Sequence, residues 1–230
     1  MPPRAALLSI PYHPRDGEEW CLEAEFMPAE ECSSELVLIC HPHPVFGGEM
    51  NNNVVNALFH GLSDTRCTAR FNFSGVGGSD GVHENGIGEI NQVKTVLAYM
   101  EHEFAKEKCD GDWSMIHLAG YSFGAAMALG AAWSSPLVAS CTTISLPFEM
   151  FSQQSTSCVE TYKDKPIPLL FMIGSRDDYT PLRVFDAWTN RFANSSQHII
   201  PGADHFFNGY EKNLVSEIKQ YLDGLIQDQS

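Results

Sequence analysis

The chain of 230 residues has no hydrophobic run long enough to cross a membrane. Its uninterrupted apolar stretches, such as residues 36–40 and 169–173, have the length of a strand, whereas a spanning helix needs roughly 20 apolar residues. Residues 1–8 carry one charge and too short an apolar stretch for a secretory signal. We therefore expect a cytoplasmic protein without a membrane partner.

Basic side chains are also scarce. The chain has 14 Lys and Arg against 29 Asp and Glu, which gives a formal net charge of -15. Such a surface repels phosphate backbones, so nucleic acid is excluded as an expected partner. A small molecule is the expected partner instead. No interface signature is readable, and the sequence leaves a homodimer open.

The seven cysteines lack any regular spacing. Their number is odd and no C-x-x-C pair occurs, which argues against a disulfide framework and against a structural zinc site. Cys40 and Cys141 stand inside apolar runs, where a free thiol behaves as a small hydrophobic group. The sequence thus predicts no metal and no cofactor.

Short apolar runs alternate with longer helical patterns along the whole chain. This alternation predicts a single α/β domain over residues 1–230, built on a doubly wound, mostly parallel sheet with helices on its faces. The first two strands are expected to pair antiparallel. The predicted strands are 7–10, 20–26, 36–40, 68–73, 114–119, 138–145, 168–173 and 197–200. The predicted helices are 53–63, 87–106, 123–132, 181–192 and a last one around 214–225.

The strongest local signal is Gly120-Tyr121-Ser122-Phe123-Gly124, between a predicted strand and a predicted helix. A serine at such a junction sits on a tight turn that lifts its hydroxyl above the sheet edge, and the glycines allow close backbone approach. Ser122 is therefore the predicted nucleophile. The alternative is that the two glycines serve only a tight turn.

Acid and histidine candidates follow in the chain order that this nucleophile turn requires. Asp177 lies in the loop after the strand 168–173, where open α/β sheets gather functional groups, and Asp178 is the alternative acid. His205 lies in a loop before the last helix, and we predict that it acts as general base and general acid. Asp177 would then fix the tautomer of the His205 imidazole and stabilise the imidazolium.

The loop after residues 36–40 is the expected source of one oxyanion-hole amide, and Phe123 of the other. Pro42 and Pro44 have no N–H, so His43 is the first candidate and Val45 the second.

Two features of the glycine- and histidine-rich loops suggest other chemistry. His41 and His43 have the spacing of two metal ligands on one strand face, but no third ligand is spaced nearby, so local hydrogen bonding is the favoured interpretation. The stretch 71–81 is rich in glycine, yet Asp80 occupies the third glycine position of a dinucleotide motif. We interpret that stretch as structural.

Three motifs together carry a resemblance. The segment His41-Pro42-His43-Pro44 with Gly47-Gly48, the stretch 70–77 and the serine motif 120–124 resemble small α/β-hydrolases related to dienelactone hydrolase. The resemblance covers roughly residues 36–226 and implies an α/β-hydrolase fold with a Ser-Asp-His triad, which falls on Ser122, Asp177 and His205. Dienelactone hydrolases proper use cysteine as nucleophile, so dienelactone itself is not the expected substrate.

The expected reaction is ester hydrolysis through an acyl-serine. About 22 residues separate Ser145 from Pro168, too few for a large lid, and residues 146–151 are the predicted short cap. The sequence therefore predicts a minimal cap and a carboxylesterase for small or medium acyl esters. A peptidase or acyltransferase with the same triad, and a hydrolase-like scaffold that binds without turnover, stay open.

Overall fold

A computed structural model describes residues 4–14, 17–31, 33–105, 113–148 and 167–227. Its sheet has eight strands in the order β1-β2-β4-β3-β5-β6-β7-β8. The strands are β1 Ala6–Tyr12, β2 Trp20–Met27, β3 Glu35–Cys40, β4 Cys67–Phe71, β5 Met115–Tyr121, β6 Val138–Ile144, β7 Leu169–Gly174 and β8 Ser195–Ile200.

Strands β1 and β2 form the antiparallel hairpin that the sequence predicts, and β2 also runs antiparallel to β4. Every other neighbouring pair in the sheet is parallel. The doubly wound, mostly parallel sheet is confirmed, and the observed strand ends differ from the predicted ones by at most two residues.

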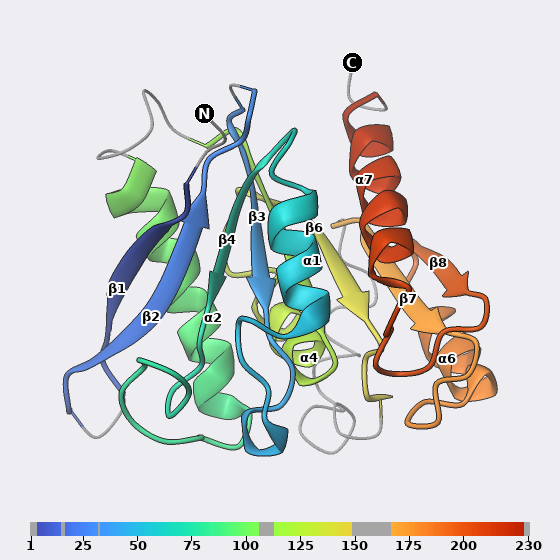
Figure 1. The fold of residues 1–230 in the computed structure, drawn as a ribbon, viewed down its shortest axis with the longest axis horizontal. Coiled ribbons are helices and arrows are strands. Elements are labelled where there is room, and N and C mark those ends of the chain that lie inside the picture. The colour runs from blue at the N-terminus through green and yellow to red at the C-terminus, as the bar shows by residue number, and fades with distance from the viewer. Residues whose placement is uncertain (1–3, 15–16, 32, 106–112, 149–166, 228–230) are drawn as a thin grey trace.

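Helices cover both faces of the sheet, with α1 and α7 on the near face and α2 and α4 behind it (Figure 1). Side chains of β3 alternate between the two cores: Leu36 and Leu38 pack with α2 and α4, whereas Val37 and Ile39 pack with α1 and α7. A strand buried on both faces must be apolar throughout, which explains its uninterrupted apolar run. The helices are α1 Asn53–Gly61, α2 Ile87–Tyr99, α4 Phe123–Ala131, α6 Leu182–Thr189 and α7 Glu211–Gln227, with a 3₁₀ turn η1 at Pro44–Phe46.

The predicted helix 87–106 does not continue as one α-helix. After Tyr99 the chain forms a π-helical turn, η2 Met100–Phe104, in which the amide of Ala105 donates to the carbonyl of Met100. The same carbonyl accepts the indole N–H of Trp113 at 2.9 Å. The wider turn buries both Met100 and Phe104. A regular α-helix fits the same apolar pattern, so the sequence alone does not reveal the π-helical turn.

The parallel strands place their carboxyl ends along one edge of the sheet. The loops that leave β3, β5, β6, β7 and β8 therefore gather there, and they carry every residue predicted for the site. Of the predicted cap, residues 149–151 lie outside the described residues. None of the described helices is long and apolar enough to cross a membrane. The cytoplasmic location and the single-domain organisation stay predictions.

Candidate active site

Ser122 occupies a strained backbone position between β5 and α4. Its φ of 54° and ψ of -118° lie in a region that non-glycine residues avoid, and such strain persists only where the surroundings fix it. The amide of Ser122 donates to the carbonyl of Ile144 at the end of β6 at 2.8 Å. The turn thus holds the serine between two neighbouring strands and presents its side chain at the sheet edge.

Both flanking glycines are required by close packing. A Cβ on Gly120 would lie 2.2 Å from the carbonyl oxygen of Gly124. A Cβ on Gly124 would lie 2.4 Å from the carbonyl oxygens of Cys40 and His41. The predicted role of these glycines is confirmed, and it has a further effect: the first turn of α4 rests directly on the loop after β3.

His205 brings the imidazole to this serine from the loop between β8 and α7. Its Nε2 lies 3.1 Å from the Ser122 hydroxyl oxygen, and its Nδ1 lies 2.9 Å from the carboxylate of Asp177. The backbone of the loop is held by Tyr121, whose hydroxyl donates to the His205 carbonyl at 2.8 Å. The rings of Tyr121 and Tyr179 both pack near the imidazole, with centroids at 5.6 and 4.4 Å.

Asp177 follows β7, and its second carboxylate oxygen accepts the amides of Tyr179 at 2.9 Å and Thr180 at 3.2 Å. Burial by itself raises the pKa of the carboxyl, but the hydrogen bonds from His205 and the Tyr179 amide, together with the nearby Ser145 hydroxyl, outweigh it, so the pKa lies below its ordinary value. Asp178, the alternative acid, is exposed. The geometry therefore selects Asp177.

These contacts fix the proton positions. An ionised carboxylate only accepts hydrogen bonds, so Nδ1 of His205 carries a proton and Nε2 presents its lone pair to the Ser122 hydroxyl. The arrangement can take a proton from the serine while Asp177 stabilises the resulting imidazolium. The structure thus brings together Ser122, Asp177 and His205 from three separate loops.

His41 and His43 have local hydrogen bonds. Nδ1 of His41 donates to the Pro42 carbonyl at 2.6 Å, and Nε2 accepts from the Phe73 amide at 3.0 Å. Burial lowers the pKa of His41 to about 4, so the ring is neutral and joins the loop after β3 to the loop after β4. Within the described parts of the chain, no group of three or more His, Cys, Asp or Glu residues could hold a metal ion.

The backbone of the loop after β3 turns through η1. Nδ1 of His43 accepts a hydrogen bond from the amide of Val45 at 3.2 Å. The amide of Val45, the second oxyanion-hole candidate, therefore already has an acceptor. Neither the amide of His43 nor that of Phe123 donates to an acceptor recorded among the described residues. Phe123 is the first residue of α4, so its amide also adds to the positive end of a helix dipole.

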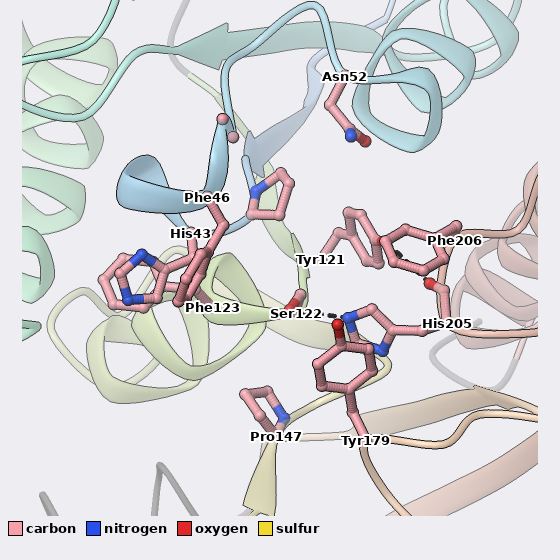
Figure 2. A pocket seen from close by; sticks show the side chains of 13 residues that line it. His43, Phe46, Asn52, Tyr121, Ser122, Phe123, Pro147, Tyr179, His205 and Phe206 are labelled. Carbon is pink, nitrogen blue, oxygen red and sulfur yellow. Dashed lines mark hydrogen bonds between the residues drawn. The ribbon is translucent and has the colours of Figure 1, made fainter.

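A pocket of about 230 Å³ opens over the serine. Figure 2 shows the Ser122–His205 contact in the middle of the pocket, with Phe46 on one side and Phe206 on the other. Among the residues that line it, none is Lys, Arg, Asp or Glu, so the wall is apolar and aromatic apart from a few polar groups. The lining residues are Pro42, His43, Phe46, Gly47, Gly48, Asn52, Tyr121, Ser122, Phe123, Pro147, Tyr179, His205 and Phe206.

The family model described as an alpha/beta hydrolase domain matches residues 35–228. The chain belongs to this family. The predicted α/β-hydrolase fold is therefore confirmed, and the protein is a hydrolase by family. The closer relationship to dienelactone hydrolase stays a prediction.

Individual relatives of this α/β hydrolase agree with the family. An alpha-beta serine hydrolase homologue from Coxiella burnetii is 31% identical with a TM-score of 0.79, and the match covers 96% of this chain and 98% of that one. An α/β hydrolase of unknown function from Agrobacterium tumefaciens is 26% identical with a TM-score of 0.78, over 96% and 97% of the two chains. An uncharacterized protein of Rickettsia prowazekii (strain Madrid E) is 29% identical over 214 residues, 90% of this chain and 86% of that protein.

Several residues of the site had no signal of their own in the sequence. Tyr121 directly precedes the serine, and Tyr179 stands two residues after the acid, so the motifs place both close to predicted site residues. Ser145 and Asn52 become neighbours of the site only through the sheet order, which no local pattern reveals, whereas Pro147 belongs to the predicted cap.

Proposed function

We propose that this α/β hydrolase is a serine carboxylesterase in which Ser122, His205 and Asp177 form the catalytic triad. The observation that carries the proposal is the continuous chain of contacts from the Ser122 hydroxyl through His205 to Asp177, at 3.1 and 2.9 Å, beneath an apolar pocket. The strained backbone of Ser122 supports the same assignment, because strain of this kind is found at functional sites.

The reaction follows from the positions of these groups. The Ser122 oxygen attacks the ester carbonyl carbon while its proton passes to Nε2 of His205. The tetrahedral intermediate carries a negative oxygen, for which the amides of His43 and Phe123 are the proposed donors. Collapse of the intermediate expels the alcohol, which takes the proton from His205 and leaves an acyl-serine. Water then repeats the sequence, with His205 as base, and releases the acid.

The pocket wall supports an uncharged, apolar acyl group as substrate. It presents aromatic rings from Phe46, Tyr179 and Phe206, and among the described residues neither Lys nor Arg lines it to pair with a substrate carboxylate. The net charge of -15 also disfavours anionic substrates. A small neutral ester is thus the proposed partner, and a homodimer stays a prediction.

Turnover of p-nitrophenyl esters with acyl chains from acetyl to dodecanoyl tests the proposal, using the wild type and Ser122→Ala. We expect the wild type to prefer short or medium chains and Ser122→Ala to lose roughly four to six orders of magnitude in kcat. Ser140→Ala is the matched control, because Ser140 is buried within β6 and bonds to His117, outside the pocket. Equal activity of Ser122→Ala and the wild type would refute the nucleophile assignment.

The same assay separates the other candidate activities. Faster turnover of a peptide p-nitroanilide than of any ester favours the peptidase, and accumulation of a transesterified product with an added alcohol favours the acyltransferase. A wild type that turns over none of the esters contradicts the esterase and favours the binding scaffold. Higher turnover on emulsified long-chain triglyceride than on soluble esters contradicts the proposed substrate size.

A further inference from the structure

Ser145 is a buried serine that the reaction above does not use. It follows β6 directly, its exposed fraction is 0%, and its φ of 47° lies in the left-handed region. Its amide donates to the carbonyl of Met172 in β7 at 2.8 Å, which fixes the residue against the strand that leads to the acid. A buried serine in the left-handed region is strained, whereas glycine adopts this conformation freely.

Ser145 lies at the start of the loop that adjoins the acid loop. Within the described residues, its hydroxyl oxygen has no hydrogen-bond partner at standard geometry, although a buried hydroxyl normally has one. The group that it influences is the Asp177 carboxyl, whose pKa it helps to lower. The two loops are also tied beside it, because the Thr180 hydroxyl donates to the carbonyl of Leu146 at 3.2 Å.

The carboxylate of Asp177 has room for this hydroxyl. Two oxygens offer about four acceptor sites. Three are used by the amides of Tyr179 and Thr180 and by Nδ1 of His205. One site is left, and in the adjoining loop the buried Ser145 has a hydroxyl without a partner in the described structure.

We propose that Ser145 is a positioning residue for Asp177, and that its hydroxyl donates to the carboxylate as His205 becomes positively charged. This inference rests on the proposed function. Hydrogen bonds of a catalytic site are often long in the free enzyme and shorten in the transition state. The Ser145 proton stays on its oxygen throughout, so the residue orients the acid and takes no part in proton transfer.

Other titratable groups around the acid are His205, Tyr179, whose ring packs against the imidazole, and, more remotely, Tyr121 and Asp204. Burial and the charge of Asp177 raise the pKa of the Tyr121 phenol, with a smaller contribution from Asp204, so Tyr121 stays protonated throughout the working range. The acid limb of the pH profile therefore belongs to the His205–Asp177 pair. Loss of the Ser145 hydroxyl raises the pKa of Asp177 and shifts that limb to higher pH.

The test compares Ser145→Ala and Ser145→Gly with the wild type and with Ser140→Ala. Both Ser145 variants remove the hydroxyl, and glycine also accepts the left-handed backbone, so it protects the test against misfolding of the alanine variant. We expect kcat to fall about tenfold in both variants, with KM within about twofold, as for loss of one hydrogen bond to a charged group. The acid limb of kcat/KM should move upward, and Ser140→Ala should keep both kcat and the limb.

An unchanged kcat in Ser145→Gly overturns the proposal, and so does a lower kcat with an unmoved acid limb, because a purely structural role would produce it. The proposed function is judged separately by Ser122→Ala. If Ser122→Ala is inactive and Ser145→Gly behaves as the wild type, only the role of Ser145 is wrong.

Discussion

Among the described residues, a serine, a histidine and a carboxylate meet twice, at opposite ends of the parallel strands. At the carboxyl ends, Ser122 and Asp177 bond to the two nitrogens of His205. Toward the amino ends, Nδ1 of His117 lies 2.8 Å from the Ser140 hydroxyl, and its Nε2 lies 3.5 Å from the carboxylate of Glu35. The residue types and contacts are alike, so the differences show what a hydrolytic site needs beyond them.

In the cluster of Glu35, His117 and Ser140, only the Glu35 side chain is partly exposed. Ser140 has an exposed fraction of 0% on an extended strand, and it does not line the pocket over Ser122. The nearby imidazole of His117, 3.5 Å away, and the charge of Arg66, 2.7 Å away, outweigh burial and lower the pKa of Glu35. Its charge is thus neutralised by a cation, whereas the charge of Asp177 is held by hydrogen bonds and faces the imidazole. A strained serine, an acid without a cationic partner among the described residues and an open pocket thus distinguish the cluster at the carboxyl ends.

The largest expected effect comes from neutralising each acid in turn. Asp177→Asn should lower kcat roughly 10⁴-fold, because an amide favours the wrong tautomer of His205. Glu35→Gln should leave kcat within about twofold but lower the free energy of unfolding by about 2 kcal/mol, since the buried Arg66 then relies on Asp223 alone. Ester turnover and urea unfolding of both variants measure this. A large loss of kcat in Glu35→Gln would remove the distinction between the two clusters.

A smaller effect concerns His41, a buried histidine that has no carboxylate among its recorded hydrogen-bond partners in the described structure. Its pKa falls from an ordinary 6.5 to about 4 on folding. Between these values the unfolded chain binds a proton that the folded chain does not, so the free energy of unfolding falls as pH falls through this window. Below a pH of about 4, His41 causes no further loss of stability. The loss should reach about 3 kcal/mol.

Urea unfolding from pH 8 to pH 4 checks this, with His41→Gln as the variant whose side chain is neutral throughout and retains an oxygen acceptor for the Phe73 amide. The variant should be less stable at pH 8 and should show a flatter decline between pH 6.5 and pH 4. Parallel declines would mean that His41 is not the source of the pH dependence.

The smallest effect tests the pocket that only one cluster has. Phe46 is 83% exposed at the pocket wall, and its ring lies 4.8 Å from that of His43. Phe46→Ala should raise KM for hexanoyl esters about threefold and leave acetyl esters unchanged, because only the longer chain reaches the lost apolar surface. Leu7→Ala is the control, since Leu7 is 72% exposed on the edge strand β1. Equal KM changes for both chain lengths would place the acyl group elsewhere.

Much of the fold was predictable because its signals are local. Strand-length apolar runs and the glycines around Ser122 follow from burial and backbone clash, and the chain order of nucleophile, acid and histidine directed attention to Asp177 and His205. These three do meet in the structure, while their catalytic roles and the oxyanion roles of His43 and Phe123 stay proposals.

The rest depends on contacts between distant segments. The cluster of Glu35, His117 and Ser140 exists because the register of β3, β5 and β6 sets these residues side by side. The π-helical turn after Tyr99 and the left-handed backbone of Ser145 likewise depend on contacts with residues far along the chain. No periodicity in the sequence encodes such meetings.

The backbone strain at Ser122 and Ser145 has a consequence for laboratory evolution of this protein. A non-glycine residue with positive φ lowers the free energy of unfolding by on the order of 1–3 kcal/mol, and glycine would relieve this strain at both positions. A selection for thermostability alone therefore enriches glycine at 122 and 145 and yields more stable proteins that lack the proposed nucleophile. Useful stabilised variants must be screened for turnover in the same round, or sought at positions remote from the carboxyl edge of the sheet.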